Sequence, residues 1–103
     1  MIRNDGIKID GVTYQANTWY KLFETTNNKL NLNVTNMGVD NELSEGNVFC
    51  TIRTDETAET RAVTSQGIIT LEPGAGIRVE QNASIWINAD TADTCIEYDY
   101  FEV

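Results

Sequence analysis

The sequence predicts an all-β protein, folded as a single antiparallel β-sandwich with jelly-roll-like connections and eight or nine short strands. Apolar and polar residues alternate with a period of two at residues 30–35, 77–80 and 96–100, as expected for strands that bury one face. Turn residues separate these segments at short intervals. No window of about 11 residues shows a convincing helical period.

The length and composition predict one globular domain that spans residues 1–103. Hydrophobic residues make up 41% of the chain and charged residues 22%, which is ordinary for a soluble globular protein. The chain contains 11 Asn and 13 Thr but one Pro. Thr favours exposed strand faces and Asn favours turns, so this composition also indicates strands joined by turns.

The first half of the chain is predicted to contain five strands. Asp10-Gly11 fits the type I′ turn of a two-residue hairpin, so the segments on either side of it are expected to pair. Asn36-Met37-Gly38 interrupts an alternating segment and is expected to end that strand. Residues 54–59 form a polar loop, and a short helix at 41–45 or 56–62 is the alternative to loops. The predicted strands are residues 7–9, 12–14, 19–23, 30–35 and 47–53.

The stretch 67–88 is predicted to organise the second half as three strands and two turns. Pro73-Gly74-Ala75-Gly76 reverses the chain, because Pro presets φ and Gly permits positive φ. Residues 81–83 make the second turn, and residues 88–93 make the last turn before the C-terminal strand. The predicted strands are residues 68–71, 77–80, 84–88 and 94–103.

The chain is acidic, with 16 Asp and Glu against 7 Lys and Arg and a net charge of −9. Because contacts to phosphate dominate nucleic-acid affinity, this sign argues against a nucleic-acid partner. No run approaches the roughly 20 apolar residues of a membrane span, so we expect no membrane partner. After Arg78 there is no basic residue. The acidic C-terminal third is either a solvated face or a face complementary to a basic partner.

The residues that usually carry catalysis are scarce. The chain has no His, so Ser-His-Asp and Cys-His machinery and the common imidazole metal ligand are missing. Carboxylate pairs such as Glu97 with Asp99, or Asp55 with Glu56, resemble those of glycosidases. Glu97 and Asp99 would lie about 7 Å apart along a strand, a spacing common to any strand with an acidic wet face. We therefore expect no enzymatic activity, no metal and no cofactor.

Two further features have a structural and a functional interpretation. Potential oxygen ligands for calcium lie close together in sequence at Asp90 and Asp93 and in the segment 40–42. Their spacing does not match an EF-hand loop. Solvated loop acids are therefore preferred to a calcium site. Cys50 and Cys95 lie in strand-like segments. Each is expected to be a small buried hydrophobe, and a disulfide between paired strands is the alternative.

The candidates for a partner interface are Trp19, Trp86, Glu97 and Asp99. Trp86 alternates with two isoleucines, so the indole and the isoleucines face opposite sides of a sheet. Large aromatic rings are the usual core of a small sandwich. The tryptophans could therefore serve in core packing, in a protein interface or in a sugar-stacking platform. The two acids are expected on the solvent-exposed face of the last strand.

The pattern of strands and turns resembles a protein family. Residues 67–103 combine a Pro-Gly turn, the segment IRVEQNASIWIN, a short polar turn and a closing strand. This run resembles the C-terminal half of small bacteriophage virion proteins, namely head decoration (cement) proteins and related β-sandwich domains of fibres and spikes. The segments NKLNLNVTN and NVFCTIR are similar to their first half. The resemblance carries over no functional residues.

The resemblance implies a non-enzymatic structural virion protein that decorates or cements a phage head. The partners would be the major capsid protein or other virion proteins, and the protein would form a homo-oligomer, with a trimer favoured. The N-terminus lacks the apolar segment of a signal peptide, so we expect assembly in the host cytoplasm and a location in the virion. The alternative is a carbohydrate- or receptor-binding β-module, either free-standing or part of a phage fibre or spike.

Overall fold

The computed structural model describes residues 7–9, 12–25, 29–54, 57–80 and 82–102. These residues form strands and no helix. They therefore contain no helix that is long and apolar enough to cross a membrane. The strands are β1 (Ile7–Ile9), β2 (Val12–Tyr14), β3 (Tyr20–Thr25), β4 (Lys29–Val39), β5 (Val48–Arg53), β6 (Ile69–Leu71), β7 (Gly76–Val79), β8 (Ala83–Ala89) and β9 (Thr94–Glu102). They make a β1-β2 hairpin, a four-stranded sheet β3-β8-β5-β6 and a three-stranded sheet β7-β4-β9, all antiparallel.

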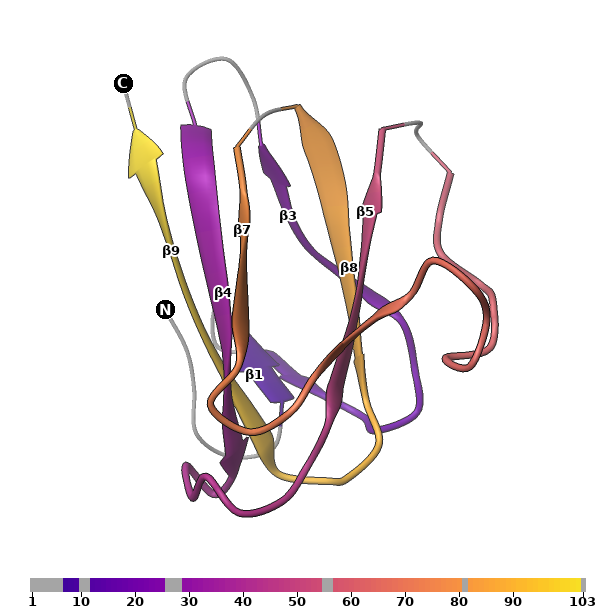
Figure 1. Cartoon of the computed structure of the whole chain (residues 1–103), viewed down its shortest axis with the longest axis vertical. Coiled ribbons are helices and arrows are strands. Elements are labelled where there is room, and N and C mark those ends of the chain that lie inside the picture. The colour runs from indigo at the N-terminus through magenta and orange to yellow at the C-terminus, as the bar shows by residue number, and fades with distance from the viewer. Residues whose placement is uncertain (1–6, 10–11, 26–28, 55–56, 81, 103) are drawn as a thin grey trace.

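The two larger sheets form two layers, as Figure 1 shows, with the core between them. Val48, Ile85 and Ile87 of the four-stranded sheet are fully buried, as are Leu32 and Val34 of the three-stranded sheet. Side chains alternate between the two faces of a strand, so the residues between these point to the outer faces. The predicted all-β fold, with two antiparallel sheets and period-two strands, is confirmed.

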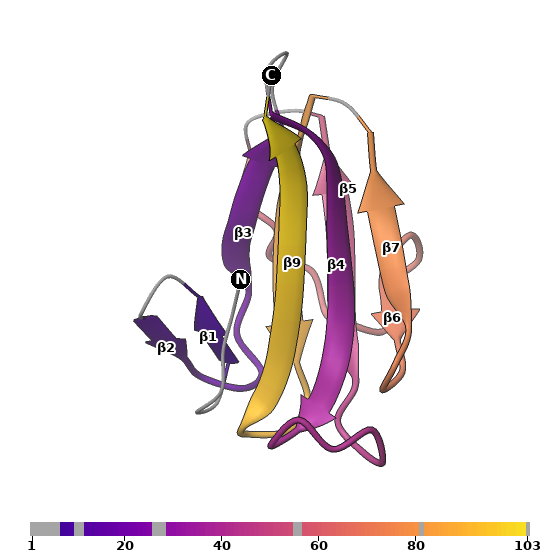
Figure 2. The same cartoon turned by 90° about the vertical axis from the view of Figure 1, so that its left-hand side faces the viewer.

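The sandwich contains seven strands, fewer than the eight or nine expected. The difference comes from β1 and β2, which pair with each other and lie beside the sandwich as a separate hairpin (Figure 2). The predicted Asp10-Gly11 turn lies outside the described residues. The other predicted strands correspond to β3–β9. Residues 41–45 contain turns, residues 57–62 are irregular, and neither of these described segments contains a helix.

The predicted end of β4 at Asn36-Met37-Gly38 is wrong, because the strand continues to Val39. Its pairing with β9 shifts register between Asn36 and Gly38, which marks a β-bulge. Gly38 has a φ of 81°, a conformation that glycine adopts without penalty. A Cβ at this position would approach the carbonyl oxygen of Glu42 to 1.9 Å. The glycine therefore bends the strand without ending it.

Asn36 is fully buried beside this bulge, and its amide joins three segments. Nδ2 donates to the carbonyl oxygens of Gly46 (2.7 Å) and Leu71 (2.8 Å), and Oδ1 accepts from the N–H of Gly38 (2.8 Å). The backbone of Asn36 also bonds to the turn at residues 72–75. One buried side chain thus ties the bulge, the β4–β5 connection and the end of β6 together.

Three connections meet at one end of the sandwich, which is at the bottom of Figure 1 and which we call the lower end. They are residues 40–47 between β4 and β5, residues 72–75 between β6 and β7, and residues 90–93 between β8 and β9. The N–H of Asp40 donates to the carbonyl oxygen of Asp93 (2.9 Å), and the N–H of Asp90 donates to that of Asn47 (3.2 Å). These bonds fix the acidic connections against one another.

Candidate functional site

The structure divides the predicted interface residues between opposite outer faces of the sandwich. Trp86 lies on the outer face of the four-stranded sheet, because the isoleucines on either side of it are fully buried. Glu97 and Asp99 are exposed on the outer face of the three-stranded sheet, where Asp99 accepts a hydrogen bond from Asn33 Nδ2 (3.0 Å). Trp86 and the two acids therefore do not form one surface.

Trp19 lies just before β3 and is half-buried. Its indole Nε1 donates to the carbonyl oxygen of Arg61, 2.7 Å away. Arg61 belongs to residues 57–68, the longer described part of the connection between β5 and β6, which we call the 57–68 loop. Figure 1 shows this loop on the outer side of the four-stranded sheet. Trp19 thus helps to hold a long loop against the sheet.

A buried carboxylate organises the 57–68 loop. The Glu59 side chain has no exposed surface, and Arg61 donates to it from Nη2 (2.6 Å to Oε1) and Nε (3.2 and 3.1 Å to the two oxygens). The N–H groups of Thr60 and Arg61 donate to Oε2 at 2.9 and 3.0 Å. Arg53, at the end of β5, pairs with Oε1 at 3.4 Å and donates to Thr57 Oγ1 at 2.8 Å. We call Arg53, Glu59 and Arg61 the Glu59 cluster.

The charge of Glu59 is strongly favoured in the folded protein. Hydrogen bonds from the Arg61 side chain lower the pKa of Glu59 from 4.5 to about 2, although burial acts in the opposite direction. Both carboxylate oxygens are occupied within the loop, so the cluster serves to hold the loop in place. The sequence predicted only a polar loop here, and no local pattern distinguishes Glu59 from the exposed acids near it.

The lower end gathers exposed acidic side chains from distant parts of the chain. They are Asp40, Glu42, Glu45, Glu72, Asp90 and Asp93. The three connections that carry them contain no Lys or Arg. Only two of the six acids follow Arg78, so the acidic C-terminal third that the sequence suggested as one face is split in the fold.

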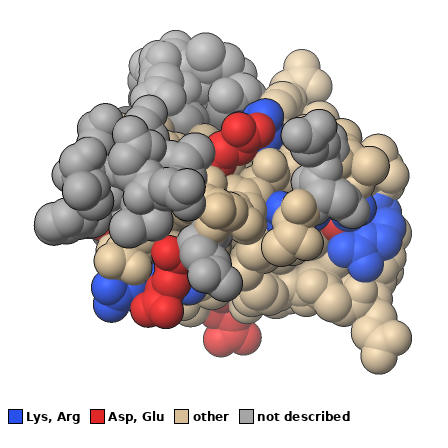
Figure 3. Space-filling view, turned by 90° about the horizontal axis from the view of Figure 1, so that it is seen from above, with Lys and Arg blue, Asp and Glu red and all other residues tan. Residues whose placement is uncertain are grey.

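The opposite end of the sandwich carries both signs of charge. Figure 3 looks down on this upper end and shows basic and acidic side chains near one another. Arg78 and Glu80 line one depression there, and Arg53 and Glu24 line a second. The molecule is therefore electrostatically polarised, with a mixed upper end and an acidic lower end.

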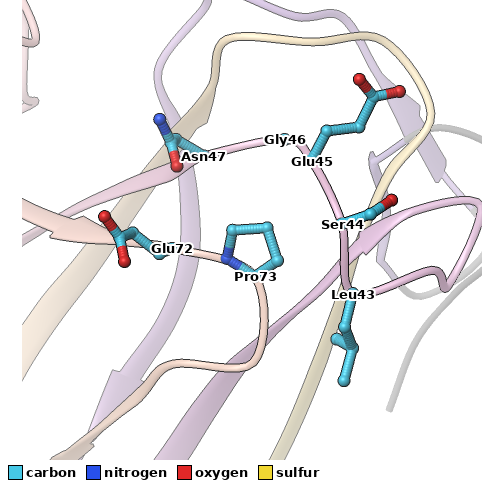
Figure 4. A pocket seen from close by; sticks show the side chains of 7 residues that line it. All are labelled: Leu43, Ser44, Glu45, Gly46, Asn47, Glu72 and Pro73. Carbon is cyan, nitrogen blue, oxygen red and sulfur yellow. The ribbon is translucent and has the colours of Figure 1, made fainter.

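The lower end also contains a depression of about 450 Å³ between two of its connections. It is lined by Leu43, Ser44, Glu45, Gly46, Asn47, Glu72 and Pro73. Figure 4 shows the ring of Pro73 between Glu72 and the segment that carries Leu43 and Glu45. Leu43 is 60% exposed. Apolar surface flanked by two carboxylates suits a Lys or Arg side chain, which has an aliphatic stem and a cationic head.

One of the acids considered for calcium, Asp90, is tied into the β4–β5 connection by its side chain. Asp90 Oδ1 accepts from the N–H of Asn47 (3.0 Å) and from Thr91 Oγ1 (2.7 Å), so this carboxylate caps the connection. Within the described part of the chain, no three His, Cys, Asp or Glu side chains are placed to hold a metal ion. The pair Asp55 and Glu56 lies outside the described residues.

Cys50 and Cys95 are free and buried, on strands of different sheets. Burial raises the pKa of the Cys50 thiol to about 12, so the thiol stays protonated and unreactive at neutral pH. The prediction that each cysteine is a small buried residue is confirmed, and the alternative of a disulfide between them is not what the structure contains.

Comparison with protein-family models, with curated proteins and with solved structures found no match. Function is therefore inferred from charge, burial and contacts. The sequence marked Asn36 only as part of an expected strand end and Glu59 only as part of a polar loop, and it did not predict their roles in organising the lower end and the 57–68 loop. Asn36 bonds to carbonyl groups of residues that are distant along the chain. Glu59 bonds to arginine side chains and to backbone N–H groups that only the folded loop brings into place.

Proposed function

We propose that this chain is a non-enzymatic structural protein that binds a larger protein assembly through its acidic lower end. The observation that carries the proposal is the gathering of six exposed carboxylates and the 60%-exposed Leu43 at one end of the sandwich. A surface of one sign attracts a partner of the opposite sign and selects against partners of like charge. The exposed leucine adds apolar area to the contact.

The partner that fits the lower end is a protein surface rich in Lys and Arg. A basic side chain would place its stem against Leu43 and Pro73 and its charge beside Glu45 and Glu72, which line the same depression. The resemblance to phage virion proteins suggests the head lattice of the major capsid protein as that surface. An oligomer on such a lattice would contact several equivalent sites at once and gain avidity.

Neutralising the depression is expected to weaken capsid binding about tenfold. The variant is Glu45→Gln with Glu72→Gln, and the measurement is binding to expanded phage heads at a series of salt concentrations. The wild-type affinity should fall steeply with salt, because exposed charges are screened beyond about 8–10 Å at physiological ionic strength. The variant should show a shallower salt dependence.

The matched control is Glu97→Gln with Asp99→Asn, which removes the same charge from the outer face of the three-stranded sheet. The control is expected to bind like wild type. If the control lost binding and the Glu45→Gln, Glu72→Gln variant did not, the contact would lie on the outer face of the three-stranded sheet and not at the lower end. A wild-type affinity that does not change with salt concentration would contradict an electrostatic contact.

We further propose that the protein is a trimer in solution. Closed cyclic symmetry is the usual architecture of homo-oligomers, and several copies are needed for the avidity described above. Sedimentation equilibrium is expected to give a mass of about three times the 11.5 kDa of the chain. A concentration-independent monomer mass would contradict this part of the proposal.

The strand pairing supports a jelly roll as the finer description of the fold. β3 pairs with β8, β4 with β7 and β5 with β6. These pairs are nested along the chain, as in one long hairpin that is rolled into two sheets. An outermost fourth pair would join β9 to a strand that precedes β3, and β1 lies against β9. We propose a jelly roll in which this outermost pair is reduced to the contact of β1 with β9.

A further inference from the structure

Three side chains on the outer face of the four-stranded sheet each carry a buried polar atom that has no hydrogen-bond partner among the residues that the structure describes. The atoms are Thr51 Oγ1, Trp86 Nε1 and Asn88 Oδ1, and Thr51 and Asn88 are only 2% and 4% exposed. Thr51 and Trp86 lie opposite each other on β5 and β8, and Asn88 follows on the same face, so the three are neighbours. Buried polar groups are nearly always paired. Three such atoms side by side therefore form a polar patch that protein groups leave unpaired and that a polar ligand could complete.

The 57–68 loop covers this face. In the sheet, β8 lies between β3 and β5. The loop is bonded to β5 through Glu59 and Arg53, and to the start of β3 through the carbonyl of Arg61 and the indole of Trp19. Residues 59–61 are therefore held between these two attachments on the outer side of the sheet (Figure 1), the side on which Trp86 lies.

Side chains make the hydrogen bonds described between this loop and the sheet. The backbone–backbone hydrogen bonds described within the loop are local: Ser65 N–H to Ala62 O (2.9 Å) and Ile68 N–H to Ser65 O (3.4 Å). Arg53 and Trp19 supply the contacts to the body of the sandwich. A loop attached in this way opens locally more readily than a strand held by a ladder of backbone bonds.

We propose that the outer face of β8 is a binding site for a neutral pyranose sugar, which enters when the 57–68 loop lifts. Asn88 offers an acceptor, Trp86 a donor and Thr51 a hydroxyl that does both, which is the complement of sugar hydroxyls. The indole adds a flat apolar surface that the C–H face of a pyranose ring can cover. Water would pair only the polar atoms, whereas a sugar would also cover the indole once the loop has lifted. This site is separate from the lower end and goes beyond the function proposed above.

The two tryptophans provide a test with opposite outcomes. Trp86→Phe keeps an aromatic ring but removes the unpaired donor, so sugar binding should weaken about tenfold. Trp19→Phe removes the N–H that holds the carbonyl of Arg61, so the loop opens more readily and sugar binding should tighten. The measurement is titration of ¹⁵N-labelled protein with the methyl glycosides of glucose, galactose, mannose and N-acetylglucosamine, followed at the indole N–H resonances.

A second variant and a control separate the sugar site from loop stability. Glu59→Gln loosens the loop by another route and should tighten binding in the same direction as Trp19→Phe. Glu97→Gln, on the opposite face, should leave sugar affinity unchanged. If none of the four glycosides moves the Trp86 resonance in wild type or in Glu59→Gln, the proposal is overturned and ordered water completes the three polar groups. Equal weakening by both tryptophan substitutions would overturn it as well, and neither outcome bears on capsid binding by the lower end.

Discussion

Replacing Asn36 with leucine is expected to lower the free energy of unfolding by about 4 kcal/mol. Leucine has a similar size but no polar atoms. It would leave the carbonyls of Gly46 and Leu71 and the N–H of Gly38, which now bond to the Asn36 amide, buried without partners. Each such orphaned group costs about 1–3 kcal/mol. Urea denaturation measures the loss directly, and the melting temperature should fall by roughly 15–30 °C for a domain of this size.

Asn33→Leu is the matched control on the same strand. Asn33 is exposed and its amide bonds to Asp99 at the surface, so water can replace the lost partner. The control is expected to change the free energy of unfolding by no more than about 0.5 kcal/mol. Similar losses in both variants would show that the buried bonds of Asn36 are not what stabilises the bulge and the lower end.

Replacing Glu59 with glutamine is expected to destabilise the protein by about 3 kcal/mol at neutral pH. The neutral amide cannot balance Arg53 and Arg61, which pair with the carboxylate now. The effect should also depend on pH. The pKa of Glu59 is lowered from 4.5 to about 2 in the folded protein, so its contribution is complete above about pH 5 and is lost as the pH falls through 4.5 toward 2.

The measurement is the free energy of unfolding of wild type and Glu59→Gln between pH 7 and pH 2. Other carboxylates titrate in both proteins, so the difference between the two curves isolates Glu59. That difference should be largest near neutral pH and should shrink toward pH 2. Glu97→Gln, which removes an exposed carboxylate, should run parallel to wild type. A difference that stays constant across this range would mean that protonation of Glu59 does not weaken the folded state.

The strands of this protein could be predicted from the sequence because their signal is local. Period-two alternation in the segment that became β4 and in β9 reports directly which side chains are buried, since neighbouring residues on a strand face opposite sides. The exposure of Glu97 and Asp99, on either side of the buried Tyr98, follows that pattern. The all-β class, the positions of seven strands in the sandwich and the burial of both cysteines therefore needed no tertiary information.

The sequence alone determined the class and most strand positions, and the tertiary structure decided where the polar side chains act. From the sequence, Asn36 was expected to help end a strand. In the fold its buried amide donates hydrogen bonds to the carbonyls of Gly46 and Leu71, which belong to other segments. Glu59 looked like one loop acid among several, and the six acids of the lower end are separated along the chain. Trp19 and Trp86 looked equivalent, yet one indole N–H is bonded and the other is not. Hydrogen bonding and charge clustering depend on groups that only folding brings within a few ångströms, whereas periodicity depends on chain neighbours alone.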